Sequence, residues 1–206
     1  MRKAALLIAL PLIASPLTAQ LERPQDWHVR FDRPGPPDSA VYFVTMEPGW
    51  HITSGPSGIL YNPSQVAQGE YRVKSEIYLF PGERREGYGI FIGGKYLADQ
   101  GQAYVYFLLR KDGHYIIKHR NGFQTPTIVP WTIHEAIAPQ SGEENAKNVL
   151  EVAVGTEKLD FYVNGEIVKS LPRGDLDTDG VVGLRVNQNL NLHVSSLTVE
   201  QNEASQ

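Results

Sequence analysis

The 206-residue sequence contains no cysteine, which excludes disulfide bonds, thiolate catalysis and cysteine-based zinc sites. It also lacks, at any point, the run of about 18 apolar residues that a membrane-spanning helix needs. The formal net charge is −4, whereas proteins that bind nucleic acids usually present a basic face. We therefore expect neither a transmembrane anchor nor a nucleic-acid partner.

Helical periodicity is missing as well. Beyond the N-terminal segment, no apolar stripe repeats every 3.6 residues or so, and no longer repeat of fixed period occurs. The chain instead has 19 glycines and 14 prolines, which divide it into roughly a dozen short segments of alternating apolar and polar residues. This pattern predicts an all-β fold, an antiparallel two-sheet β-sandwich.

The first 19 residues have the features of a secretory signal peptide. Arg2 and Lys3 precede a short apolar run over residues 4–13, and Ala19 offers a small residue at a cleavage site. The run is too short for a stable membrane anchor. We expect a soluble mature protein that is periplasmic or secreted. The expected divisions are a signal peptide over 1–19, a single β-sandwich domain over 20–200 and a flexible tail over 201–206.

The clearest strand pattern lies between residues 148 and 200. In LEVAV and LDFYV, apolar residues alternate with other residues at period two, which predicts one buried and one exposed face for each strand. Asn164 and Gly165 follow the second strand and predict a two-residue hairpin turn, because both tolerate positive φ. Asp112-Gly113 and Asn121-Gly122 give the same turn signal earlier in the chain.

Two segments interrupt this rhythm. Residues 55–62 read as a loop. Residues 123–146, with several prolines, read as a long crossover loop with a short helical turn near His134. The remaining predicted strands lie at residues 27–31, 41–46, 50–52, 69–80, 87–93, 103–111 and 114–120.

The segments FYVNG and GLRVN, each within a valine- or leucine-rich strand, carry a resemblance to known proteins. They resemble the end of a concanavalin A-like (laminin G-like) jelly-roll domain, and are similar to the 3-keto-disaccharide hydrolase domain of secreted bacterial proteins. The resemblance covers the last third of the chain and extends back to about Gly69. Because these residues are structural, it implies a jelly-roll architecture more directly than an activity. It also implies saccharide binding, as in lectin-like members, and a possible structural calcium.

A polar and aromatic sheet face is the main candidate site. Aromatic rings stack on the C–H faces of sugars, while arginine and asparagine hydrogen-bond to sugar hydroxyls. The hairpin partner strand supplies either Tyr115 with His119 or His114 with Lys118, because a shift of one residue exchanges the two faces. The alternative is a solvated face whose side chains only cover the strands. The predicted face comprises Tyr104, Tyr106, Arg110, His119, Arg185, Asn187 and His193.

The segment DLDTDG resembles the front half of a calcium-binding loop. Asp175, Asp177 and Asp179 stand at alternate positions before Gly180. The twelfth position would be Val186, which cannot ligate a metal, and no helices flank the loop. The alternative is an acidic turn that leads into the next strand.

The leading hypothesis is an exported, non-catalytic, lectin-like module that binds a saccharide or polysaccharide. It is expected to need no cofactor, unless the acidic loop holds calcium. The Glu-x-Asp-x-x-Glu string of glucanases with this fold is missing, and the histidines show no metal-binding spacing. One alternative, implied by the resemblance, is a hydrolase acting on 3-keto-glycosides or related sugars. A second alternative is a module that binds protein partners.

Overall fold

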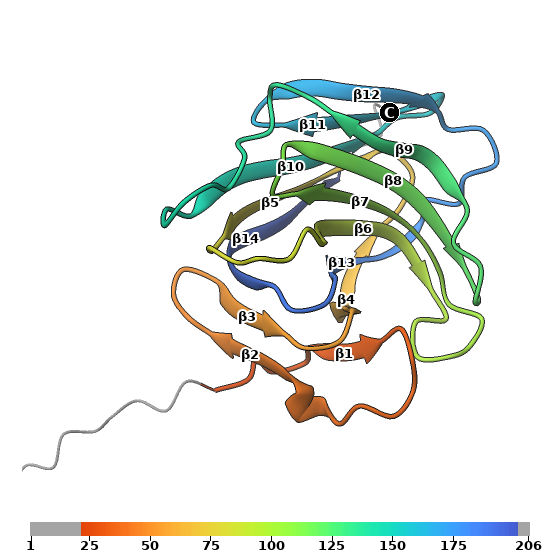
Figure 1. Ribbon diagram of the computed structural model, residues 1–206. Helices are drawn as coiled ribbons and strands as arrows, with labels where there is room; N and C mark the ends of the chain where they lie inside the picture. Colours follow the sequence, from red (N-terminus) through yellow and green to blue (C-terminus); the bar gives the residue numbers. More distant parts are fainter. Residues whose placement is uncertain (1–21, 202–206) are drawn as a thin grey trace, which may run out of the picture.

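The computed structural model describes residues 22–201, and this part of the chain forms a β-sandwich of fourteen strands in two sheets (Figure 1). The predicted signal peptide and most of the predicted tail lie outside the described residues. Within the described part, no helix is long and apolar enough to cross a membrane. Among residues 22–201, the single helical element is a 3₁₀ turn, η1 (Asp38–Ala40).

Each sheet has seven strands, and every neighbouring pair is antiparallel, as predicted. Sheet A has the order β1 (His28–Phe31), β4 (Gly58–Ala67), β13 (Gly180–Val186), β6 (Gly87–Lys95), β7 (Ala103–Arg110), β8 (His114–Asn121) and β9 (Thr127–Ile133). Sheet B has the order β12 (Glu166–Pro172), β11 (Lys158–Val163), β10 (Ala146–Val154), β5 (Tyr71–Leu79), β14 (Asn191–Gln201), β3 (Trp50–Ser54) and β2 (Val41–Thr45).

The core between the sheets follows from the alternation in the sequence. Leu150, Val152 and Val154 on β10 are at most 1% exposed, and the residues between them point away from the core. Phe107 on β7 meets Phe161 on β11 edge-to-face, with ring centroids 5.3 Å apart, which joins the two sheets directly.

Sheet A is also apolar on its outer face, the face turned away from the shared core. A second buried cluster lies there, and strand β6 is buried along nearly its whole length. Most side chains on the outer face are therefore apolar and buried, and the face is not a plain solvated surface. The cluster consists of Ile59, Tyr61, Phe91, Leu97, Tyr104, Tyr106, Leu108 and Ile116.

The hairpin predicted at Asn164-Gly165 is confirmed. Both residues have positive φ, 52° and 88°, and they join β11 to β12. Gly113 and Gly122 also have positive φ, 77° and 58°, at the turns on either side of β8.

Both predicted loops contain strands that the sequence analysis missed. Strand β4 occupies Gly58–Ala67, where Ile59 and Leu60 are buried on opposite faces, so the apolar run lacks the alternation of a half-exposed strand. Strand β9 occupies Thr127–Ile133 and tolerates Pro130 because it is an edge strand with an irregular register. Near His134 the structure has a single turn, in which the Ile137 N–H donates to the His134 carbonyl at 3.2 Å, and no longer helix is formed there.

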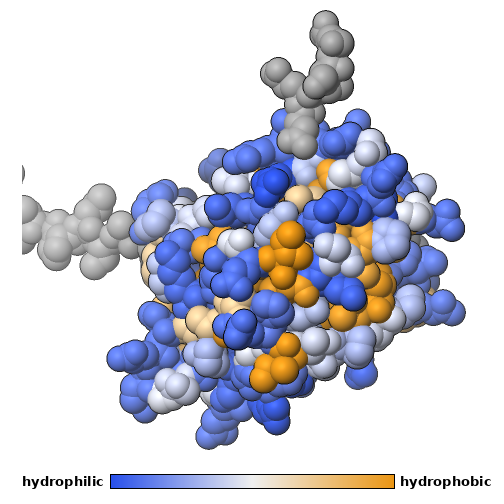
Figure 2. All heavy atoms as spheres, turned by 90° about the horizontal axis from the view of Figure 1, so that it is seen from above, coloured by the Kyte–Doolittle hydropathy of each residue, from blue (hydrophilic) through white to orange (hydrophobic). Residues whose placement is uncertain are grey.

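The surface is mainly hydrophilic where Figure 2 shows it. On that face, hydrophobic side chains form separate patches among hydrophilic residues.

Candidate functional site

Sheet A is curved so strongly that side chains from its first and sixth strands meet over its outer face. Asp32 directly follows β1, and its Oδ1 lies 3.7 Å from Nη1 of Arg120 on β8. Four strands separate β1 from β8, which in a flat sheet would amount to roughly 24 Å at about 4.8 Å per strand spacing. An aspartate and an arginine cannot span that distance, so the outer face is concave; Figure 1 shows β6–β9 arching accordingly.

A cleft opens on this concave face. Its floor and walls come from β7, β8, β9 and the end of β13. Tyr106 and Lys118 are direct cross-strand partners, and the exposed ring of Phe123 stands at the edge. Six of the residues that line the cleft matter most for its chemistry: Tyr106, Lys118, Arg120, Trp131, Arg185 and Asn187.

An ion-pair network holds one side of the cleft. Both terminal nitrogens of Arg185 donate to the two carboxylate oxygens of Asp32, each at 2.5 Å. The Arg185 side chain is 7% exposed and that of Asp32 is 27% exposed, so the pair is largely shielded from water. Desolvation acts to lower the pKa of Arg185, but Tyr104 and the hydrogen bond to Asp32 raise that pKa overall. Arg185 is therefore a fixed cation that ties β13 to the segment after β1.

Two further arginines join the network through one amide. The Gln102 side-chain oxygen accepts hydrogen bonds from Arg30 at 3.3 Å and from Arg120 at 3.2 Å when its amide faces them. Arg30 also donates to the backbone oxygen of Ala98 at 2.7 Å. Gln102 is buried, so these contacts hold three elements of sheet A together above the second apolar cluster.

Aromatic rings lie against the cationic groups. The Arg185 guanidinium carbon is 5.6 Å from the centre of the Tyr106 ring, and that of Arg110 is 4.5 Å from the Trp131 ring. Burial raises the pKa of Tyr106 to about 12, although the charge of Arg185 acts in the opposite direction. Tyr106 is thus a neutral hydroxyl at physiological pH.

Trp131 is positioned by a glycine. A Cβ atom at Gly87 would lie 3.1 Å from the Trp131 ring and 2.9 Å from the Leu108 side chain. The missing side chain at Gly87 lets the indole lie close to β6, beside the cleft floor. Its half-buried ring then presents one aromatic wall of the cleft.

Three buried polar atoms in this region have no hydrogen-bond partner among the described residues. They are the Arg185 Nε, the Asn187 Oδ1 and the Tyr104 hydroxyl. Such atoms are unusual in protein interiors, where nearly all polar groups are paired. Two of the three belong to residues that line the cleft.

The structure brings together five of the seven residues predicted for the face. Tyr106, Arg185 and Asn187 line the cleft. Tyr104 lies beneath it, 1% exposed, with its ring centroid 5.7 Å from that of Tyr106. Arg110 stands at the rim through its contact with Trp131.

The other two predicted residues lie elsewhere. His119 is the cross-strand partner of Val105, which faces the core between the sheets. Cross-strand partners lie on the same face, so His119 points away from the cleft. Of the two alternatives left open for this strand, the structure therefore selects His114 with Lys118. His193 belongs to β14 in sheet B, where it pairs with His51, far from the cleft in the strand order.

Several cleft residues were missed by the sequence analysis. Arg120 has the same parity as Lys118 on β8, and this could have placed it on the face. Trp131 was overlooked because its strand was read as a loop. Asp32 lies in a proline-rich connector with no local pattern, and nothing in the sequence indicates its partner Arg185.

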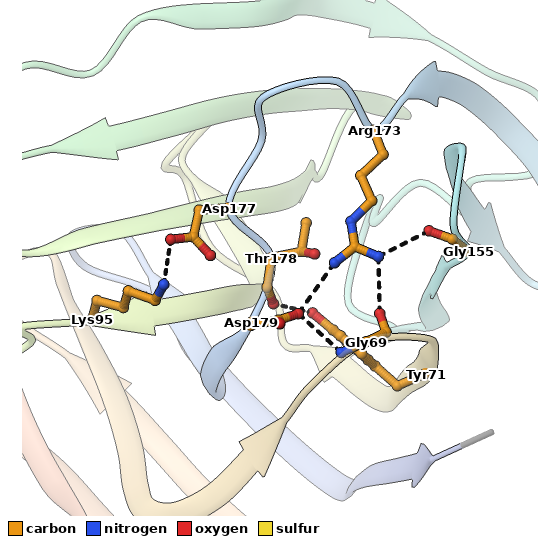
Figure 3. Close-up of polar contacts among 8 residues, drawn as sticks. All are labelled: Gly69, Tyr71, Lys95, Gly155, Arg173, Asp177, Thr178 and Asp179. Atoms are coloured by element: carbon orange, nitrogen blue, oxygen red, sulfur yellow. Dashed lines mark hydrogen bonds and ion pairs between the residues drawn. The ribbon is translucent and has the colours of Figure 1, made fainter. Parts of the chain in front are cut away.

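The three carboxylates predicted for calcium do not form a cluster. Asp177 pairs with Lys95, while Asp179 Oδ1 accepts from Arg173 and from the Gly69 N–H, at 3.1 and 3.0 Å (Figure 3). Among the described residues, no group of three His, Asp or Glu side chains could hold a metal ion. Asp175 is exposed and joins neither interaction. The acidic-turn alternative describes this loop.

No protein-family model matches the sequence, and no curated protein matches it. The comparison with solved structures does find relatives in shape. The carbohydrate-binding module CBM66 from Bacillus subtilis aligns with a TM-score of 0.64 at 12% identity, covering 85% of this chain and 96% of that one. The fold is an antiparallel jelly-roll β-sandwich.

Two further jelly rolls resemble the chain to a similar degree. The Emp46p carbohydrate recognition domain aligns with a TM-score of 0.60 at 10% identity, covering 87% of this chain and 90% of that one. A GH16 protein of a Bacteroides ovatus mixed-linkage glucan locus aligns with a TM-score of 0.61 at 6% identity, covering 87% and 96%. At these identities the likeness shows the fold alone. The similarity to the 3-keto-disaccharide hydrolase domain stays a prediction.

Proposed function

We propose that this jelly roll is a non-catalytic, saccharide-binding module and that the cleft on the concave face of sheet A is its binding site. The observation that carries the proposal is the combination of aromatic and hydrogen-bonding groups in one hollow. Trp131 offers a half-buried ring surface next to the largely buried Tyr106, while Lys118, Arg120 and Asn187 offer polar atoms. Sugars present apolar C–H faces and a dense set of hydroxyls, which such a lining matches.

The similar structures support the same proposal. Two of the three are carbohydrate-binding domains, and the third is a complex with a glucan product. Those properties belong to those proteins, and they support the proposal because the fold is shared.

Hydrolysis is the weaker alternative because of the carboxylates. Most glycosidases need two carboxyl groups facing one bond. Among the described residues that line the cleft, Asp32 is the carboxylate, and both its oxygens are engaged by Arg185. A protein-binding role receives no specific support on the face in Figure 2, where hydrophobic residues lie in separate patches.

Export belongs to the same proposal. We propose a signal peptide over 1–19, a single domain over 20–200, and a final location in the periplasm or outside the cell, with no nucleic-acid partner. N-terminal sequencing of protein recovered from the periplasm and medium tests this. A retained N-terminus on exported protein would contradict the cleavage site.

The decisive experiment for binding is a glycan array probed with purified parent protein, Trp131→Ala and Tyr42→Ala. Tyr42 is half-exposed on β2 of the other sheet and is the matched control for loss of a surface ring. We expect parent and Tyr42→Ala to bind the same glycan, and Trp131→Ala to bind it at least about tenfold more weakly. Absence of any glycan hit, with the protein folded by circular dichroism, would overturn the proposed function.

A further inference from the structure

The positive charge around the cleft exceeds the negative charge. Arg120 and Arg185 share one carboxylate, Asp32, while Arg30 forms no ion pair among residues 22–201. Arg120 and Arg185 are both less than a tenth exposed, so water screens their charges poorly. The site is preorganised, because hydrogen bonds hold these cations in place before any ligand binds.

Lys118 adds a cation that can reach a ligand. Its ammonium group contacts the Thr125 hydroxyl at 3.3 Å and pairs with no carboxylate in the described part of the chain. It lines the cleft directly beside Tyr106. Arg110, by contrast, is neutralised by Asp112, to which it donates two hydrogen bonds at 2.8 and 2.9 Å. The excess charge is therefore concentrated at Lys118 and Arg120.

The acidic groups near the cleft do not cancel this excess. Glu86 approaches through Asn187, whose Nδ2 donates to its carboxylate at 3.3 Å. Among the residues that line the cleft, Asp32 is the carboxylate against the three cations Lys118, Arg120 and Arg185, and Glu86 adds a second carboxylate nearby. Buried or half-buried cations without partners are costly, so an anion that enters the cleft is favoured over a neutral group of the same shape.

The unpartnered atoms do not themselves face a ligand. The Arg185 Nε and the Asn187 Oδ1 are both buried. Lys118, by contrast, is only partly buried and lines the cleft, so its ammonium group is the cation that an acidic sugar can contact.

From these observations we infer that the cleft is selective for acidic saccharides, whose carboxylate or sulfate group binds against Lys118 and Arg120. The inference rests on the proposed function and names its ligand class. The anionic group lies at the Lys118 end of the cleft, and the sugar ring lies against Trp131.

The test uses the full chain on an array that displays neutral, uronic acid-containing and sulfated oligosaccharides. We expect the strongest hits among the acidic sugars. Isothermal titration calorimetry then compares the best uronate with its methyl ester, or the best sulfated sugar with its desulfated form, which distinguishes the two sources of charge. We expect the neutral form to bind at least about tenfold more weakly, and the acidic form to weaken as salt is raised.

Lys118→Gln locates the charge, and Lys74→Gln, an exposed position on β5 of sheet B, is the matched control for net charge. Lys118→Gln should reduce the preference for the acidic form, and Lys74→Gln should not. Equal binding of acidic and neutral forms would overturn this inference and leave the proposed function standing. An unchanged preference in Lys118→Gln would overturn the assigned position. Binding of no saccharide at all would overturn the proposed function itself.

Discussion

At the scale of single residues, Asp32 joins parts of the chain that lie far apart in the sequence. It is the carboxylate for two arginines, and it joins the N-terminal part of the chain to β13 and β8. The same residue lines the cleft, so a side chain from a connector joins two strands that contribute to it.

We predict that Asp32→Ala lowers the free energy of unfolding by about 3 kcal/mol, because it leaves the buried Arg185 without its charge partner. The measurement is a urea unfolding curve. The double variant Asp32→Ala/Arg185→Leu removes both charges and should recover much of the loss. A single variant as stable as the parent would show that water or Tyr104 satisfies Arg185.

At the scale of elements, the loop between β9 and β10 depends on one buried side chain. Asn148 on β10 is fully buried; its oxygen accepts from the Ala138 N–H and its amide donates to the Ala138 carbonyl, both at 2.9 Å. The Asn164 amide also donates to Asn148, at 3.0 Å, so the hairpin turn after β11 helps to hold the loop.

Replacing Asn148 with alanine should therefore release this loop. We expect the amide of Ala138 to exchange its hydrogen much faster, and the protein to lose about 2–3 kcal/mol, because the backbone groups of Ala138 lose their partners. Hydrogen exchange with mass spectrometry measures the first effect. Asn191→Ala, at an exposed position on β14, is the control and should leave exchange in the loop unchanged.

The segment before β13 is an element held by an arginine. Arg173 donates to the backbone oxygens of Gly69 and Gly155, each at 3.1 Å, and also to Asp179 (Figure 3).

We predict that calcium or a chelator leaves the melting temperature unchanged, whereas Arg173→Ala lowers it, by a few degrees. A calcium-dependent rise in the melting temperature would contradict the arrangement described.

The sequence predicted the structure correctly where a pattern of a few neighbouring residues determines it. Period-two alternation predicted that Tyr104, Tyr106, Arg185 and Asn187 share a side, and Asn164 predicted its turn, because each signal spans a few residues. Strands with both faces buried, such as β4, lack that signal. Contacts such as Asp32 with Arg185 join residues 153 positions apart, and no local pattern reports them.

At the scale of the whole molecule, buried tyrosines make the folded state less stable at alkaline pH. Tyr88 is 1% exposed, and burial raises its pKa from 10.0 to about 12, despite a hydrogen bond from Asn148 that acts in the opposite direction. Between these values the unfolded chain releases the proton while the folded chain keeps it. Stability from Tyr88 is therefore complete below pH 10 and is lost as the pH rises towards 12.

We predict that the free energy of unfolding falls by about 2–3 kcal/mol for Tyr88 across this range, since two pKa units correspond to roughly that amount. Urea unfolding at intervals between pH 9 and pH 12 measures the slope. Tyr88→Phe should make the slope shallower, although other buried tyrosines such as Tyr106 still contribute, and Tyr42→Phe, at a half-exposed position, should leave it unchanged. A slope that is identical in Tyr88→Phe and the parent would contradict this assignment.

The two ends of the described chain close the sandwich together. Strand β14 lies between β5 and β3, and Asp32 meets an arginine on β13. On a ribosome, the early hairpin of β2 and β3 therefore lacks its neighbour in sheet B until β14 has emerged. Folds dominated by such distant pairings form slowly, in about milliseconds to seconds. The cleft likewise needs a late strand, because Arg185 comes from β13, which lies between the much earlier strands β4 and β6.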